Sequence, residues 1–372
     1  MHYLAIIMKK LLITILFISF YTTLQSQDFS LVDEAINTSI QDSVFPGGTF
    51  LVGNEEGLIY KNAYGNFTYE TSSPKVENNT IFDLASVTKA FGTTFCVMKL
   101  VDDKKLDINK PVAYYLPEFA ANGKENVRVV DLLIHESGLQ PYYTPQENEC
   151  RTHIVDTIKS LNLSYETGLN TKYSCLNLVT TMMVVESIID EPMYKFYAEN
   201  FTTPLEMERT FFTPNDEMKK LCIPTSKELQ GVVHDPLARG LEGLSGNAGL
   251  YSTIEDLSKL CQILLNKGTY KGKRYLSEEV ITNFSKQYSP QSDRAIGFDT
   301  KGAAGENSLS GLYTSKKTFG HLGYTGTSIW IDPVNKVYFV FLTNRVYPDD
   351  TAHVNGTRRK VHTNAMISLG LD

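Results

Sequence analysis

The chain has 372 residues, of which 42% are hydrophobic and 21% charged, a balance typical of a globular protein with a substantial core. Its formal net charge of −7 argues against a nucleic-acid partner, because domains that bind nucleic acid usually carry an excess of basic residues. The composition also excludes a collagen-like or largely disordered chain.

Residues 1–26 have the pattern of a cleaved signal peptide. Lys9 and Lys10 precede an apolar run from Leu11 to Phe20, and the segment ends on the small residue Ser26. The run is too short to act as a stable membrane anchor. We therefore predict that the mature chain, 27–372, is periplasmic or secreted. A buried N-terminal helix is the alternative, and the sequence does not decide between a start at Met1 and one at Met8.

The first part of the mature chain predicts a helix and then a β-hairpin. Residues 30–40 have helical spacing, and Pro46-Gly47-Gly48 interrupts the pattern. Two β-rich runs, 49–52 and 58–60, flank a polar turn, which is the pattern of a hairpin.

The middle of the chain is mainly helical. Apolar residues recur every three or four positions from Val87 to Val101, which predicts a helix over 83–101 with Asp83 as its N-cap. Further helices are expected over 127–134, 154–161, 176–189 and 254–265, and four glycines predict a tight loop over 240–249.

The end of the chain becomes β-rich again. Two apolar runs, 328–331 and 337–342, predict a second hairpin, and 357–369 can form a last helix. Strands at both ends and helices between them predict an α/β (α+β) fold. An antiparallel sheet from both termini (about 27–85 and 240–372) would be flanked by helices and would carry an inserted, mostly helical region (about 86–239). The junction of the two parts is a common place for a pocket.

Two S-x-x-K patterns occur, at Ser86-Val87-Thr88-Lys89 and at Ser72-Ser73-Pro74-Lys75. A lysine one helical turn from a serine can take or relay its hydroxyl proton and so activate a poor nucleophile. Only the first pattern is placed near the start of a predicted helix, because Pro74 and its polar neighbours indicate a loop. Ser86 is therefore the candidate nucleophile.

The cysteines and histidines indicate no metal site. Cys96, Cys150, Cys175, Cys222 and Cys261 are scattered and include no C-x-x-C pair, so spacing selects neither zinc ligands nor a disulfide pair. Five histidines form no metal-ligand spacing and are predicted to lie at the surface or in loops: His135, His153, His234, His353 and His362. We expect no metal and no cofactor.

Two more patterns follow Ser86 in order: Tyr173-Ser174-Cys175 before an apolar helix, and His321-Leu322-Gly323 before a predicted strand. Together with the first S-x-x-K, they resemble the S-x-x-K, Y-x-N and [KH]-x-G motifs of the class C β-lactamase and penicillin-binding-protein family. The segments 129–139 and 246–260 are similar to further stretches of that family. The resemblance spans roughly residues 30 to 370.

The resemblance implies a β-lactamase/transpeptidase-like serine hydrolase and assigns roles. Ser86 would be acylated, Lys89 would shuttle its proton, and Tyr173 would act as general base if nearby positive charge lowers the pKa of its phenol. The N–H groups of Ser86 and Tyr324 would form the oxyanion hole. Substrate contacts would come from Cys175, His321, Gly323 and Arg345, the last as a carboxylate contact.

Two positions depart from the family pattern. His321 stands where many relatives have lysine, and a neutral imidazole supplies less charge to depress the pKa of Tyr173. Cys175 replaces the usual asparagine, and a thiol is a weak hydrogen-bonding group. Ser174 or Asn177 could compensate, and Cys175 itself is expected to be a buried, inert thiol.

The expected substrate is a small molecule or a cell-wall peptide, with an ester, a D-amino-acid peptide or a β-lactam-like bond. The alternatives are a penicillin-binding or regulatory pseudo-enzyme of the same fold, and an unrelated secreted binding protein.

Overall fold

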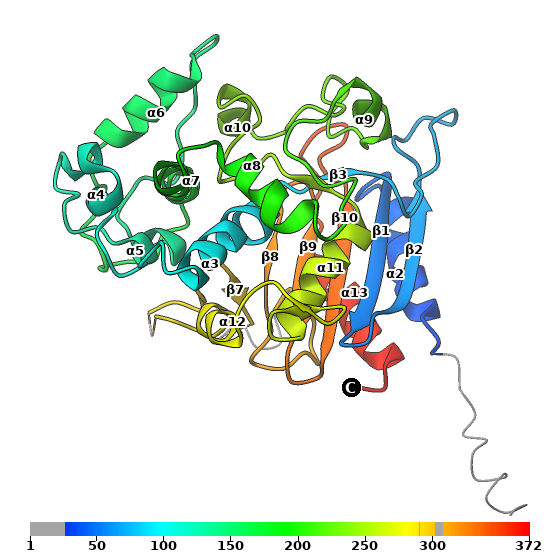
Figure 1. The fold of residues 1–372 in the computed structure, drawn as a ribbon. Helices are drawn as coiled ribbons and strands as arrows, with labels where there is room; N and C mark the ends of the chain where they lie inside the picture. The colour runs from blue at the N-terminus through cyan, green and yellow to red at the C-terminus, as the bar shows by residue number, and fades with distance from the viewer. Residues whose placement is uncertain (1–26, 290, 302–307) are drawn as a thin grey trace, which may run out of the picture.

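The computed structural model describes residues 27–289, 291–301 and 308–372 (Figure 1). The predicted signal peptide lies outside the described residues. Within the described part, no helix combines the length and the apolar character needed to cross a membrane.

A six-stranded antiparallel sheet with the order β2-β1-β10-β9-β8-β7 joins the two ends of the chain. β1 pairs with β10 from Gly48 opposite Thr343 to Asn54 opposite Val337. This pairing confirms the predicted fold class, a sheet built from both termini, and both predicted hairpins are present. The strands are β1 (Gly47–Asn54), β2 (Leu58–Gly65), β7 (Asp299–Thr300), β8 (Phe319–Leu322), β9 (Ser328–Asp332) and β10 (Val337–Thr343).

Helices cover both faces of the sheet. The terminal helices α2 (Ser30–Gln41) and α13 (Asn355–Ser368) pack together on one face, and α11 (Ile254–Leu265) packs on the other (Figure 1). Alternate side chains of β10 serve the two layers: Phe339 belongs to the cluster beneath α2 and α13, and Val340 belongs to the larger core. The apolar run of β10 therefore reflects burial on both faces.

The segment between β2 and α11 forms a mainly helical region beside the sheet (Figure 1). Its helical segments are η1 (Lys89–Thr94), α3 (Phe95–Asp102), α4 (Val112–Tyr115), η2 (Pro117–Ala120), α5 (Val129–Leu133), α6 (Arg151–Ser160), α7 (Cys175–Ile189), α8 (Met193–Tyr197), η3 (Ala198–Thr202), α9 (Asp216–Leu221) and α10 (Pro236–Gly240). The remaining elements are β3 (Phe82–Asp83), β4 (Tyr251–Ser252), β5 (Thr269–Tyr270), β6 (Lys273–Arg274) and α12 (Glu278–Ser285).

The prediction that Asp83 caps a helix over 83–101 is wrong. Asp83 lies in the short strand β3, where its buried carboxylate accepts the N–H groups of Ala85 and His234. Ala85 then adopts a left-handed conformation with φ 46°, and the helix starts after Ser86. A sharp turn between strand and helix therefore presents Ser86.

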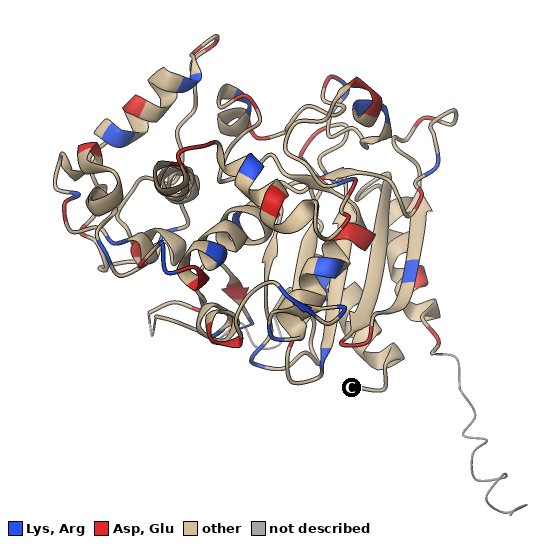
Figure 2. Cartoon of the chain, viewed as in Figure 1, with Lys and Arg blue, Asp and Glu red and all other residues tan. Residues whose placement is uncertain are grey.

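Charged residues of both signs are interspersed over the outer helices and loops, and the strands of the sheet are nearly free of them in the same view (Figure 2).

The five cysteines are all free thiols.

Candidate active site

Ser86 and Lys89 contact each other directly. The Lys89 Nζ donates hydrogen bonds to Ser86 Oγ at 2.8 Å and to the carbonyl oxygen of Asn247 at 2.9 Å. The Lys89 side chain is only 1% exposed, so these bonds hold the ammonium in place against solvent. The second S-x-x-K pattern has no such geometry, because Ser72 and Lys75 are exposed in a loop. The contact with Asn247 shows what the glycine-rich segment 240–249 contributes.

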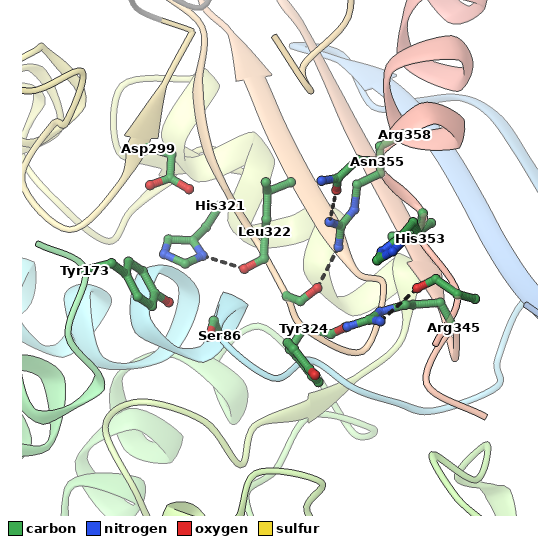
Figure 3. Close-up of a pocket in the computed structure, with 13 residues that line it drawn as sticks. Ser86, Tyr173, Asp299, His321, Leu322, Tyr324, Arg345, His353, Asn355 and Arg358 are labelled. Carbon is green, nitrogen blue, oxygen red and sulfur yellow. Dashed lines mark hydrogen bonds between the residues drawn. The ribbon is translucent and has the colours of Figure 1, made fainter. Parts of the chain in front are cut away.

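Tyr173 is the third member of the group that Ser86 and Lys89 form. It lies just before α7, its phenolic oxygen points toward Ser86, and its ring centroid is 4.9 Å from Lys89 Nζ (Figure 3). Tyr173 as a whole is 36% exposed at the mouth of the cleft, while its hydroxyl end points inward, toward Ser86. Thus a hydroxyl, an ammonium and a phenol from two distant parts of the chain meet at one point.

The pKa values of Tyr173 and Lys89 are set by burial and by the charges that surround each group. Burial raises the pKa of Tyr173, and the opposing effect of the Lys89 ammonium does not cancel that rise. Burial alone would lower the pKa of Lys89, but the neighbouring acidic groups of Cys175 and Tyr173 raise it above its usual value. The condition set for Tyr173 as general base, a phenol pKa lowered by nearby positive charge, is therefore not met in the resting arrangement: at neutral pH the site holds an ammonium and a neutral phenol.

Two further residues contact the Tyr173 ring and were not identified from the sequence. The buried His135 imidazole lies 4.5 Å from it between centroids, and the Arg294 guanidinium lies 5.2 Å from the ring centroid. Arg294 also forms an ion pair with Asp299 on β7. The segment 129–139, noted for its family resemblance, is the signal that could have pointed to His135; Arg294 had none.

His321 is buried on β8 and faces Tyr173, with 6.2 Å between ring centroids. Burial lowers its pKa to about 4, even though the nearby Asp299 acts in the opposite direction. Its Nδ1 lies 2.8 Å from the carbonyl oxygen of Leu322, so in the neutral ring this nitrogen carries the proton (Figure 3). The imidazole therefore adds no positive charge at neutral pH.

Ser86 and Tyr324 present unpaired backbone N–H groups. Neither amide donates a hydrogen bond to another residue in the described parts of the chain. Gly323, just before Tyr324, permits the close approach of the β8–β9 turn to the serine segment. A Cβ at this position would lie 2.0 Å from Thr327 Oγ1 and 2.4 Å from the carbonyl oxygen of Leu84. The glycine is thus required by the protein's own backbone.

Arg345 is neither a solvated surface residue nor a free guanidinium. It is 8% exposed, and its Nε donates to the carbonyl oxygen of Tyr324 at 2.7 Å. Its Nη1 donates to the carbonyl oxygens of Asp350 and Ala352. Most of its donors are therefore committed to holding the backbone, although the residue lines the cleft.

Cys175 is half-buried and lines a cavity beside Ser86, so the expectation of a buried thiol is wrong. The suggested substitutes do not reach the cavity. The hydroxyl of Ser174 donates to the carbonyl oxygen of Gln140, and Asn177 is fully buried against Ser137 and His135.

The prediction that the remaining histidines lie at the surface or in loops is wrong for His362, which is fully buried in α13. His135 lies in a turn as predicted, but its ring is buried. The sequence does not show these burials, because both residues are covered by segments distant in the chain.

Two cavities meet at Ser86, Tyr173 and Tyr324. One, of about 380 Å³, has walls of mixed character and is lined among others by His321, Arg345, Asn355 and Arg358 (Figure 3). The other, of about 540 Å³, has more apolar walls that include Tyr142, Leu229 and Ala248. A substrate could therefore extend from the serine in two chemically different directions.

A serine hydrogen-bonded to a lysine at the start of a helix, beside a turn whose N–H has no partner among the described residues, is the arrangement typical of acyl-transferring serine hydrolases. A beta-lactamase family model matches residues 32–363, and the chain belongs to this family of serine hydrolases.

A curated relative, the N-acetylmuramyl-L-alanine amidase of Bacillus subtilis (strain 168), is 30% identical over 354 residues, which cover 84% of this chain and 80% of the relative. Solved structures show the same fold. A penicillin-binding protein homologue from Caulobacter crescentus superposes with a TM-score of 0.76 at 19% identity, covering 91% of this chain and 97% of that one. A family VIII carboxylesterase gives 0.75 at 19% identity with the same coverage.

Proposed function

We propose that this protein hydrolyses amide or ester bonds through an acyl-enzyme on Ser86, and that its substrates are fragments of cell-wall type. The observation that carries the proposal is the 2.8 Å hydrogen bond from the buried Lys89 ammonium to Ser86 Oγ. A lysine with no carboxylate partner among the described residues, held at a serine hydroxyl, serves proton transfer better than it serves stability.

The reaction begins when the group formed by Lys89 and Tyr173 loses one proton, because an ammonium and a neutral phenol cannot accept another. Ser86 Oγ then attacks the substrate carbonyl carbon, and its proton passes to this group. The N–H groups of Ser86 and Tyr324 stabilise the oxyanion. Collapse of the intermediate breaks the bond to the leaving group, which takes the proton. Water then attacks the acyl-enzyme, with the same two side chains moving its proton, and releases the acid.

The substrate class is supported by the relative named as an N-acetylmuramyl-L-alanine amidase, whose name specifies an amide bond of the cell wall. The neutral His321 supplies less attraction for a substrate carboxylate than a lysine would. We therefore expect weak turnover of β-lactams, and faster turnover of amides or esters.

A labelling experiment tests the nucleophile. The purified protein is treated with a fluorophosphonate and with a fluorescent penicillin, and intact masses are followed over time. We expect an adduct that Ser86→Ala abolishes and that the control Ser72→Ala, in the exposed second motif, retains. A penicillin adduct that never decays, with no substrate turnover, would favour the binding-only alternative. No adduct with either probe would contradict the proposal.

A substrate panel then tests the bond. It includes p-nitrophenyl esters, nitrocefin, a D-alanyl-D-alanine peptide and a muramyl-L-alanine amide. Turnover of nitrocefin that exceeds that of every ester and amide would contradict the proposed substrate class.

We also propose that residues 1–26 direct export to the periplasm or the medium. Cell fractionation and the mass of the mature N-terminus test this: a protein that stays in the cytoplasm with its first residues intact would contradict it.

A further inference from the structure

The turn between β8 and β9 is held by a buried arginine that reaches it from the C-terminal helix. Arg358, near the start of α13, donates from Nη2 to the carbonyl oxygen of Gly323 at 2.6 Å (Figure 3). The same Nη2 donates to the carbonyl oxygen of Thr327 at 2.7 Å. Its Nη1 donates to the Oδ1 of Asn355 at 3.1 Å. No pattern in the sequence indicated this residue.

The carbonyl of Gly323 belongs to the same peptide unit as the N–H of Tyr324. In a planar trans peptide these two groups point in opposite directions, so a restraint on one is a restraint on the other. The Tyr324 N–H is the donor assigned to the oxyanion hole. A guanidinium that fixes the Gly323 carbonyl therefore also fixes the direction of that donor.

The burial of the charged Arg358 guanidinium beneath this turn lowers the stability of the folded protein. Arg358 is 5% exposed and forms no ion pair with a carboxylate in the described residues. Burial, with repulsion from Arg345, lowers the pKa of its guanidinium to about 9. A buried cation without a counter-charge is unfavourable. An apolar side chain of similar length would fill the space at lower cost, so the hydrogen bonds to the turn account for an arginine here.

The serine side of the oxyanion hole is tied to the same turn. Thr325 Oγ1 donates to the carbonyl oxygen of Asp83 at 2.7 Å, and Thr327 Oγ1 donates to that of Leu84 at 2.9 Å. These bonds join the turn to the backbone just before Ser86. Arg358 adds the third support, from α13, so the two N–H donors are held relative to each other.

We infer that Arg358 is a positioning residue that aims the Tyr324 N–H at the oxyanion by holding the Gly323 carbonyl. The inference rests on the proposed function, because it needs an acyl-transfer reaction to act upon. It differs from a role in substrate binding, which would be expressed in KM for anionic substrates.

The test compares Arg358→Met with Lys360→Met, which removes an exposed cation from the same helix. Each variant is assayed with a neutral p-nitrophenyl ester and with its thionoester, in which sulfur replaces the carbonyl oxygen. Sulfur is a weak hydrogen-bond acceptor, so the thionoester gains little from the N–H donors. The ratio of the two rates therefore reports on the oxyanion hole itself.

For Arg358→Met we expect kcat for the oxygen ester to fall about 10- to 100-fold with little change in KM, and the oxygen-to-sulfur rate ratio to fall with it. Arg358→Lys, which keeps a cation and a donor, should recover part of both. Lys360→Met should match the wild type.

An unchanged oxygen-to-sulfur ratio in Arg358→Met would overturn the inference, as would a rise in KM confined to anionic esters. If Arg358→Met does not fold, the ratio measured in Arg358→Lys decides. Failure of the wild type to hydrolyse either ester would instead count against the proposed function.

Discussion

The protonation of the groups beside Ser86, the proposed nucleophile, is decided by a competition between burial and charge. The Tyr173 hydroxyl and the Lys89 ammonium face each other beside Ser86, and both have a raised pKa. His321 takes no proton at neutral pH, because burial lowers its pKa to about 4. At neutral pH the pair of Lys89 and Tyr173 must therefore lose one proton before it can act as a base.

The reactive form of this site should thus become more populated as pH rises. For the wild type we expect kcat/KM for a p-nitrophenyl ester to increase between pH 7 and 9, by up to about tenfold per pH unit. Tyr173→Phe should lower the rate and flatten the rise. Tyr288→Phe, at a partly exposed tyrosine that lines neither cavity at Ser86, should keep the slope. If kcat/KM of the wild type does not change between pH 7 and 9, the protonation of the phenol–ammonium pair does not control the rate.

The β8–β9 turn shows how an element can be built around one close contact. Gly323 lies against the backbone of Leu84, and hydroxyls of Thr325 and Thr327 bond across the same contact. Any side chain at position 323 must push the turn away from the serine segment. The distance between the N–H groups of Ser86 and Tyr324 therefore depends on a residue without a Cβ at position 323.

Gly323→Ala should separate these segments, because its Cβ would lie within 2.4 Å of Leu84 O. We expect at least a tenfold loss of kcat and a free energy of unfolding lower by about 1–3 kcal/mol. Gly356→Ala is the matched control. It lies in α13, where a Cβ meets nothing within 4 Å, and should be neutral or stabilising by up to about 1 kcal/mol. Ester kinetics and urea unfolding measure both, and full activity in Gly323→Ala would contradict the assignment.

On the scale of the whole molecule, the two termini form one layer. α2 and α13 cover one face of the sheet, and His362 of α13 is buried between them and the sheet, where its ring lies near Phe50 and Phe339. Its Nδ1 lies 2.8 Å from the carbonyl oxygen of Leu309. Burial lowers its pKa from the usual 6.5 to about 4. Between these two pH values the unfolded chain binds a proton that the folded chain does not, so stability falls as pH falls.

His362 should therefore contribute to acid sensitivity. Between pH 7 and 5, the loss in the free energy of unfolding should be smaller in His362→Gln than in the wild type by about 2 kcal/mol. His353→Gln, at an exposed histidine, should retain the wild-type loss. Urea unfolding at the two pH values measures the difference, and equal losses in wild type and His362→Gln would show that this histidine is not the source.

Features that depend on neighbours in the chain could be predicted from the sequence. Hydrophobic periodicity located both hairpins and helices such as α11, because side chains three, four or two positions apart share a face whatever the rest of the chain does. For the same reason Ser86 and Lys89, three positions apart at a helix start, were expected to meet, and the second S-x-x-K was rejected on its proline.

Tertiary structure alone decided the remaining features. The carbonyl of Asn247 at Lys89, His135 and Arg294 at the Tyr173 ring, and Arg358 beneath the Gly323 carbonyl join residues far apart in sequence. Burial and the direction of each pKa shift depend on which distant segments exclude water from a group. The sequence by itself determined which chemical groups this protein has and how they are spaced locally. Folding decided which of them touch and which carry a proton, because both depend on contacts that no local pattern contains.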